Sequence, residues 1–210
     1  MQLQPGTLLL NGKSRIVRRL GGGSSAEVYG ATQLGLNAPR APKSLNLAGV
    51  GSTEVTKYAA RFDFQGRLQA RLKGHRRIVE VYDTDILDGA PVLIMEYCEG
   101  GSLQDELGAA AKPRQALSVT RTSEVLLDIA DGMAALHRLN CVHRDLKPSN
   151  LLLDSARRAK ISDLGLAQSG GDRLPYAYRT LSGRAGSVSK AQTATSLTIC
   201  GIRTGMQDIL

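Results

Sequence analysis

The chain has 210 residues, 42% of them hydrophobic and 22% charged, as in a soluble globular protein long enough for one domain or two small lobes. Lys and Arg (27) exceed Asp and Glu (19), giving a net charge of +8, but the cations are scattered, so we expect no nucleic-acid partner. The three cysteines lie far apart, which excludes a disulfide framework and a structural zinc site.

No apolar stretch approaches the roughly 18 residues of a membrane span, and the apolar run near the N-terminus is too short for a signal peptide. Together with the cysteine pattern, this favours a cytoplasmic protein with no membrane segment in this chain. Nothing in the sequence defines an oligomeric state.

The first hundred residues predict mainly strands. These strands are expected over residues 13–20, 26–34, 40–47, 77–87 and 90–98. The first two form a hairpin around a glycine cluster, and Asp88-Gly89 is the turn between the last two. Pro42 within the third strand suggests a sheet edge or an irregular start. Apolar residues at helical spacing predict one helix over 55–74, interrupted at Gly66.

After residue 98 the pattern becomes mainly helical. A long helix is predicted over 118–140, with one apolar face made by Val125, Leu126, Ile129, Met133 and Leu136. The runs "LLLD" and "AKISDLGLAQ" then predict a short hairpin, and from Ser169 onward no periodicity remains. We therefore expect two lobes, 14–98 and 99–168, followed by an irregular tail over 169–210.

The glycine cluster at residues 21–23 lies between two predicted strands. Backbone without a Cβ at Gly21 and Gly23 can approach a phosphate closely and direct N–H groups at it. A glycine-rich hairpin tip is, however, just as often an ordinary turn. The cluster also differs from the dinucleotide-binding βαβ fingerprint, because a strand rather than a helix follows it.

A second group of polar residues follows the long helix. Asp145 and Asn150 lie five residues apart, and Asp163 comes 18 residues after Asp145. Carboxylate and amide oxygens are the ligands that Mg²⁺ prefers, and a further carboxylate could take a proton from an attacking hydroxyl. The alternative is a set of surface turn residues, but the apolar runs on both sides of the group argue against it.

The segments "HRDLKPSN" (143–150) and "DLG" (163–165) resemble the catalytic loop and the metal-binding motif of eukaryotic-type, bacterial-like serine/threonine protein kinases. The glycine cluster, Lys43 and "LIMEYCEGGSL" occur in the order and spacing of the family's glycine-rich loop, its strand lysine and its adenine-binding hinge. The resemblance extends over roughly residues 14–168. It implies an α+β, two-lobed protein-kinase-like fold with a complete β-rich N-lobe and a truncated helical C-lobe.

The resemblance also implies a reaction, the transfer of the γ-phosphoryl group of ATP to Ser or Thr hydroxyls of a protein substrate, with Mg²⁺. Asp145 would be the catalytic base, Lys147 would neutralise the transferred group, and Arg144 would pair with a phosphate on the activation loop. Asn150 and Asp163 would bind Mg²⁺. The ATP-binding residues would be Gly21, Gly23, Val28, Ala41, Lys43, Met95, Glu96 and Cys98.

The chain departs from the family pattern in three respects, two of which are single residues in the first lobe. Ala26 replaces the third glycine of the loop, and Gln65 occupies the position of the helix glutamate that pairs with Lys43. Glu54 is expected in the loop before that helix, so it offers no substitute. A neutral amide can hydrogen-bond to Lys43 but gives up the charge-assisted part of the bond.

The largest departure lies at the C-terminal end. Glu124 is the last glutamate, so the family's Ala-Pro-Glu motif is absent from this sequence. We expect a catalytic domain truncated after the activation segment, which would leave Leu126 and Leu136 poorly covered, and Thr180 is a phosphorylation site only by its spacing. Two alternatives to an active kinase therefore stay open, namely a pseudokinase that binds nucleotide or partners, and an inactive fragment.

Overall fold

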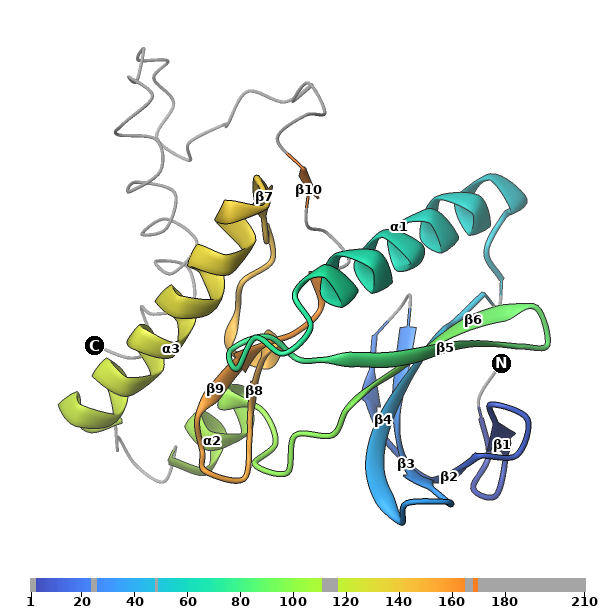
Figure 1. Ribbon diagram of the computed structural model, residues 1–210, viewed down its shortest axis with the longest axis horizontal. Coiled ribbons are helices and arrows are strands. Elements are labelled where there is room, and N and C mark those ends of the chain that lie inside the picture. Colours follow the sequence, from blue (N-terminus) through green and yellow to red (C-terminus); the bar gives the residue numbers. More distant parts are fainter. Residues whose placement is uncertain (1–2, 24–25, 48, 111–116, 165–167, 170–210) are drawn as a thin grey trace. The chain divides into compact units, whose positions relative to one another are not determined.

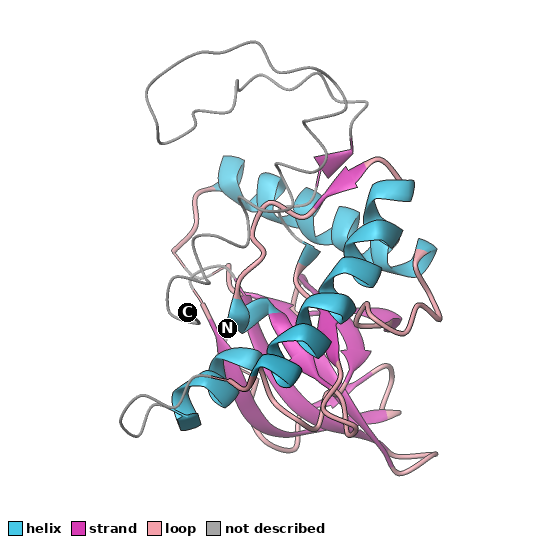
Figure 2. Ribbon diagram, turned by 90° about the vertical axis from the view of Figure 1, so that its left-hand side faces the viewer, coloured by secondary structure: helices cyan, strands magenta, loops and turns pink. Residues whose placement is uncertain are grey.

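The computed structural model describes residues 3–23, 26–47, 49–110, 117–164 and 168–169. The described residues form two compact units. The first unit comprises those in Met1–Glu99 and Asp163–Gly165, and the second comprises those in Gly100–Ser162 and Leu166–Leu210. Strands predominate in the first unit, and the second contains two of the three α-helices in the described part of the chain (Figure 2).

The first unit is built on an antiparallel six-stranded sheet with the strand order β1-β2-β3-β4-β6-β5 (Figure 1). Its strands are β1 (Leu8–Leu9), β2 (Ser14–Gly22), β3 (Ala26–Gln33), β4 (Ala38–Leu45), β5 (Val81–Leu87) and β6 (Ala90–Glu96). The five longer strands confirm the predicted ones, although β5 begins four residues later than expected. Asp88 and Gly89 both have positive φ, as the two-residue turn between β5 and β6 requires.

The expectation that Pro42 marks a sheet edge is wrong. Strand β4 lies inside the sheet between β3 and β6, and Pro42 is buried there opposite Ile94. A proline removes only one donor from the ladder, and the neighbouring residues of β4 still pair with strands on both sides. The rest of the ladder therefore holds the strand in place.

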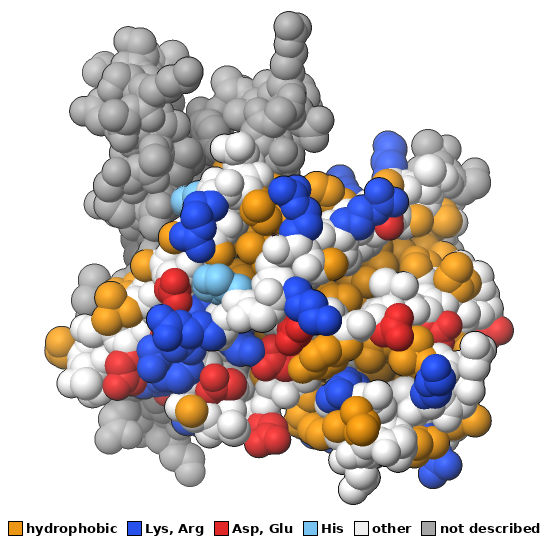
Figure 3. Space-filling view, viewed as in Figure 1, with side chains coloured by type: hydrophobic (Ala, Val, Ile, Leu, Met, Phe, Trp, Pro, Cys, Tyr) orange, Lys and Arg blue, Asp and Glu red, His pale blue; other side chains and the backbone are white. Residues whose placement is uncertain are grey.

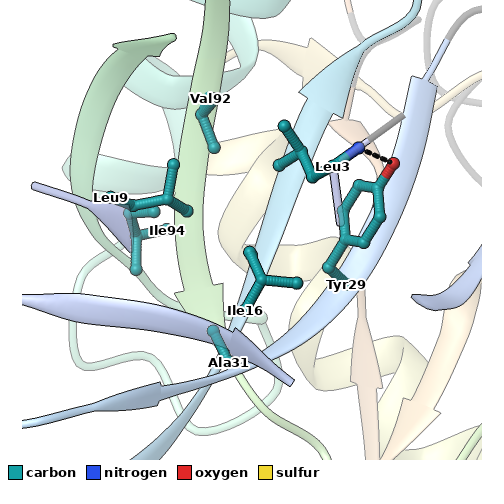
Figure 4. Close-up of a cluster of buried hydrophobic side chains, with 7 residues drawn as sticks. All are labelled: Leu3, Leu9, Ile16, Tyr29, Ala31, Val92 and Ile94. Carbon is teal, nitrogen blue, oxygen red and sulfur yellow. Dashed lines mark hydrogen bonds between the residues drawn. The ribbon is translucent and has the colours of Figure 1, made fainter. Parts of the chain in front are cut away.

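A cluster of buried side chains covers one face of this sheet (Figure 4). Its members come from the N-terminal segment and four strands, and they are Leu3, Leu9, Ile16, Tyr29, Ala31, Val92 and Ile94. The Tyr29 hydroxyl accepts a hydrogen bond from the Leu3 N–H at 3.0 Å and donates one to the Glu27 carboxylate. Burial and then the bond to Glu27 raise the pKa of Tyr29. The cluster leaves the opposite face of the sheet for the residues described below.

Helix α1 (Ser52–Arg71) packs against β4, β5 and β6 of the same sheet. It continues without interruption through Gly66, where a Cβ would lie 3.0 Å from the Leu93 side chain of β6. The glycine therefore allows close approach to the sheet and does not end the helix. Glu54 lies in the first turn of α1, not in the preceding loop as expected.

The second unit contains α2 (Leu103–Ala110), α3 (Val119–Arg138) and the hairpin of β8 (Leu151–Leu153) and β9 (Ala159–Ile161). The strand β7 (Cys141–Val142) pairs with β10 (Gln168–Ser169), and the short 3₁₀ turn η1 (Pro148–Asn150) precedes β8. The long helix and the hairpin confirm the prediction.

Helix α3 begins after Ser118, whose side chain accepts a hydrogen bond from the Arg121 N–H at 3.1 Å, as an N-cap residue does. The helix packs on β7 and β9, and Leu136 is completely buried. The expectation that Leu126 and Leu136 would be poorly covered is therefore wrong for Leu136, since the apolar face of α3 is directed at these strands, whereas Leu126 is only half-buried. Residues 170–210, including most of the expected irregular tail, lie outside the described part.

Candidate functional site

The first group of site residues gathers around Lys43 on β4. The Lys43 ammonium donates hydrogen bonds to Oε1 of Gln65 on α1 at 3.0 Å and to Oδ1 of Asp163 at 2.6 Å. Lys43 and Gln65 are buried, whereas the Asp163 side chain is 46% exposed. This hydrogen bond confirms the prediction that Gln65 lies at the position that pairs with Lys43. The lysine is thus held by one charged and one neutral partner.

The predicted adenine-site residues of the strands lie beside Lys43. Val28 of β3 pairs with Lys43, and Ala41, two residues before it on β4, pairs with Met95 of β6. Residues two apart on a strand, and residues directly opposite each other, share a face of the sheet. The sheet therefore brings Val28, Ala41, Lys43 and Met95 onto one face, opposite the cluster of Figure 4.

The two remaining hinge residues are placed differently. Glu96 is the last residue of β6 and pairs with Arg40. Because it follows Met95 directly, the Glu96 side chain lies on the face of the sheet opposite that of Met95. The Glu96 N–H donates to the Glu80 carbonyl at 2.9 Å, so this N–H is already used within the first unit. Cys98 follows the strand as a half-buried thiol.

The glycine cluster ends β2 and faces the start of β3. A Cβ on Gly22 would lie 2.8 Å from the Ala26 carbonyl oxygen, whereas a Cβ on Gly21 or Gly23 would meet no atom within 4 Å. The Gly23 N–H donates to the Ala26 carbonyl at 2.9 Å. Gly22, which the sequence analysis did not single out, is therefore the glycine that the hairpin itself requires. At Gly21 and Gly23 the space that a Cβ would occupy is open, which suits the close approach of a phosphate.

The second group of site residues lies in the second unit, between β7 and β8. Oδ2 of Asp145 accepts hydrogen bonds from the Lys147 ammonium at 2.8 Å and from Nδ2 of Asn150 at 3.1 Å. Nδ2 of Asn150 also donates to the Asp145 main-chain carbonyl at 2.8 Å. Oδ1 of Asp145 accepts no hydrogen bond from a described residue. The carboxylate is thus fixed through one oxygen, with the other oxygen left to act on a ligand.

The buried side chain of His143 holds this loop through two hydrogen bonds. It is buried, its Nδ1 accepts a hydrogen bond from the Asp145 N–H at 3.2 Å, and its Nε2 therefore donates to the Ser162 carbonyl at 2.9 Å. The Ser162 N–H and hydroxyl both donate to the Asn150 carbonyl. The sequence analysis assigned His143 no role of its own, and only the apolar pair Cys141-Val142 directly before it hints at its burial.

Two site residues have backbone conformations that side chains disfavour. Arg144 has φ of 68° and Asp163 has φ of 54°. Such conformations cost free energy and occur at functional sites, where the surrounding structure imposes them. The Arg144 side chain is exposed, and the structure does not join it to Asp145, Lys147 or Asn150 through any hydrogen bond between described residues.

Asn150 and Asp163 each carry a side-chain oxygen of the kind that binds Mg²⁺. Because Nδ2 of Asn150 is used twice, its oxygen is the atom available to a cation, and Asp163 offers a half-exposed carboxylate. Within the described ranges, no three His, Cys, Asp or Glu side chains gather as a metal site.

An ion-pair network braces the helices of the second unit. Glu106 of α2 accepts two hydrogen bonds from the Arg121 guanidinium of α3, at 2.9 and 3.0 Å, and lies 2.9 Å from Arg157. These contacts, first the hydrogen bond from Arg121, lower the pKa of Glu106 against the opposing effect of burial.

Comparison with known proteins identifies the family to which this sequence is similar. The sequence model of the protein kinase domain matches residues 14–185. A probable serine/threonine-protein kinase, pknA2 of Bifidobacterium longum, is 33% identical over 160 residues, which is 76% of this chain and 20% of that protein. PknL of Mycobacterium bovis is 32% identical over 160 residues, 76% of this chain and 38% of that protein.

A third relative, the serine/threonine-protein kinase PrkC of Bacillus subtilis, is 31% identical over 160 residues, or 75% of this chain and 23% of PrkC. The chain thus spans between one fifth and two fifths of the length of these relatives. No helix in the described ranges is long and apolar enough to cross a membrane. The match over residues 14–185 and the β-rich first unit confirm the predicted resemblance, and the chain belongs to the protein kinase domain family.

Proposed function

We propose that this chain acts as an ATP- and Mg²⁺-dependent serine/threonine protein kinase. The observation that carries the proposal is the geometry at Asp145, whose carboxylate is fixed through Oδ2 by Lys147 and Asn150 and keeps Oδ1 for a substrate hydroxyl. A carboxylate positioned in this way is suited to orient a hydroxyl and accept its proton. The family match over residues 14–185 supports the same reaction.

Each site residue then has a role. Asp145 takes the proton of the attacking hydroxyl, and the Lys147 ammonium offsets charge on the transferred phosphoryl group. Lys43 binds the α- and β-phosphates of ATP, and the open space at the Cβ positions of Gly21 and Gly23 lets the backbone lie close over these phosphates. Asn150 and Asp163 hold Mg²⁺, which supplies positive charge against the phosphate oxygens. Val28, Ala41 and Met95 provide apolar contacts for adenine, and the backbone of Glu96 and Cys98 provides its polar ones.

The substrate is proposed to be a protein Ser or Thr hydroxyl, because "Lys147-Pro148" follows "HRDL" and the compared relatives are serine/threonine-protein kinases by name. Lys and Arg side chains lie in separate groups between acidic and apolar ones on the face displayed in Figure 3. This distribution suits small anionic segments better than one long polyanion. The proposed compartment is the cytoplasm, which supplies ATP and keeps Cys98 and Cys141 as thiols.

One observation favours a second function, a pseudokinase that binds nucleotide without transferring phosphate. Lys43 has a neutral Gln65 where the family pattern has glutamate, so the ion pair that prepares the lysine is replaced by a weaker bond. The two functions differ in one measurable respect, since only the kinase needs the Asp145 carboxylate.

The test is transfer of labelled γ-phosphate from ATP to peptides that differ only in carrying Ser, Thr or Tyr. The wild-type chain should label the Ser and Thr peptides, and Asp145→Asn should lower the rate about 10²- to 10⁴-fold while Mg²⁺-ATP binding persists. Glu124→Gln, a change of an exposed carboxylate in the same unit, serves as the control. Nucleotide binding with no labelling by the wild-type chain would favour the pseudokinase.

A further inference from the structure

Two glutamines on one face of α1 continue inward from Lys43 as a row of hydrogen bonds. Gln65 and Gln69 are each only 1% exposed. Nε2 of Gln65 donates to Oε1 of Gln69 at 3.0 Å, and Nε2 of Gln69 donates to the Val79 carbonyl at 2.8 Å. With the bond from Lys43 to Gln65, three successive hydrogen bonds connect β4, α1 and the segment that precedes β5. We call this row the amide relay.

The chemistry of its two ends determines the direction of the relay. The Val79 carbonyl can only accept, so Gln69 must present its NH₂ group there and its oxygen to Gln65. The Lys43 ammonium can only donate, so Gln65 must present its oxygen there and its NH₂ group to Gln69. Rotating either amide by half a turn would place like groups together at both of its contacts. Although side-chain amides are easily assigned the wrong way round, these ends allow one arrangement.

We propose that Gln69 is a positioning residue for the nucleotide site, because it keeps the oxygen of Gln65 directed at Lys43. Without an acceptor at position 69, the buried NH₂ group of Gln65 loses its partner, so the Gln65 side chain can leave the rotamer in which its oxygen accepts from Lys43. This inference rests on the proposed role of Lys43 in binding the phosphates of ATP. Gln69 does not touch Lys43 in any described contact, and its influence passes through Gln65.

The relay also explains how the helix is anchored without an acidic residue at position 65. An ionised glutamate there could only accept, so it would face Oε1 of Gln69 and favour rotation of that amide away from Val79. Gln65 and Gln69 therefore form a matched pair, in which each amide suits the other. The two lie four residues apart on the face that also carries the buried Phe62, Leu68 and Leu72.

Two substitutions at position 69 separate positioning from packing. Gln69→Met preserves length and approximate volume but removes both polar groups, so it abolishes the acceptor for Gln65. Gln69→Glu keeps an oxygen that accepts from Gln65 but has no NH₂ group, so it loses the hydrogen bond to the Val79 carbonyl. The exposed Gln104 of α2, changed to Met, is the control.

The measurements are the Kd for Mg²⁺-ATP by calorimetry and the unfolding temperature of the complete chain. We expect Gln69→Met to raise the Kd about tenfold, and Gln69→Glu to restore most of that affinity even though both variants unfold at lower temperature. A purely structural role predicts that affinity follows unfolding temperature in both variants. That result, or an unchanged Kd in Gln69→Met, would overturn the inference.

Failure of the proposed function would look different, since the wild-type chain itself would then bind no Mg²⁺-ATP. In that case the unfolding temperatures of single and double variants at Gln65 and Gln69 would still show whether the two amides are coupled. Gln65→Met and Gln69→Met should together cost less than the sum of their separate effects, because each breaks the same bond. Strict additivity would contradict the relay whether or not nucleotide binds.

Discussion

Nζ of Lys43 and Oδ1 of Asp163 lie 2.6 Å apart, although 120 residues separate them in the chain. The lysine side chain is 9% exposed and the aspartate side chain is 46% exposed. The ammonium is therefore shielded from solvent, whereas solvent reaches the carboxylate. A buried ammonium without a partner would be costly, and the open carboxylate can still offer an oxygen to a cation. The contact therefore serves both the stability of the first unit and the proposed binding of Mg²⁺-ATP.

Asn150 is the first position at which a small change should have a large effect. In Asn150→Asp the two bonds donated by Nδ2 are lost, and a second carboxylate then faces Asp145. We expect a lower unfolding temperature and a loss of phosphate transfer of at least about tenfold. Peptide labelling and thermal unfolding measure the two effects.

The control is Asn140→Asp, because Asn140 is exposed and aspartate tolerates its φ of 55°. Equal effects of the two changes would contradict the role assigned to Asn150.

The glycine cluster offers a matched pair of neighbouring substitutions. Gly22→Ala places a Cβ 2.8 Å from the Ala26 carbonyl oxygen, which forces the two strands apart, whereas Gly23→Ala meets no atom within 4 Å. We expect Gly22→Ala to destabilise the first unit by about 1 to 3 kcal/mol and Gly23→Ala to leave stability nearly unchanged. Chemical unfolding followed by circular dichroism tests this difference. The steric account fails if the two variants unfold alike.

The Glu106 network predicts a specific pH dependence. Because hydrogen bonding by Arg121 lowers the pKa of Glu106 in the folded chain, the unfolded chain binds protons more readily. The stabilisation is thus complete above about pH 4.3, the ordinary glutamate pKa, and is lost as the pH falls through the lowered value. Glu106→Gln should cost roughly 1 to 2 kcal/mol at neutral pH and progressively less in acid.

Unfolding of wild type and Glu106→Gln at a series of pH values measures this difference directly. A difference that stays constant down to about pH 3 would show that the ion pair does not provide the stabilisation.

The parts of the structure that could be predicted from sequence are those with a local signal. Alternation of apolar residues identified the longer strands, and Asp88-Gly89 identified a turn by its need for positive φ. The spacing of the motifs was sufficient to place Gln65 at Lys43, a contact between α1 and β4. For the strands and the turn, the pattern within a few residues already determines the geometry, whereas Gln65 was placed by its distance along the chain from the family motifs.

What could not be predicted depends on tertiary packing. Pro42 reads as an edge residue, but neighbours on both sides hold β4 inside the sheet. Nothing in the sequence around Gln69 distinguishes it from an ordinary polar helix residue, because its partner, the Val79 carbonyl 2.8 Å from Nε2, is brought there only by the fold. Glu54 was placed in a loop because the polar start of α1 carries no periodic signal.

The most direct test of the account is thermal unfolding of the complete chain with and without Mg²⁺-ATP, beside Asp163→Ala. The account predicts a cooperative transition in the wild-type chain that ATP raises only when Mg²⁺ is present, and that ATP no longer raises in Asp163→Ala. A transition that nucleotide does not raise, or raises equally in Asp163→Ala, would contradict the proposed Mg²⁺-ATP site.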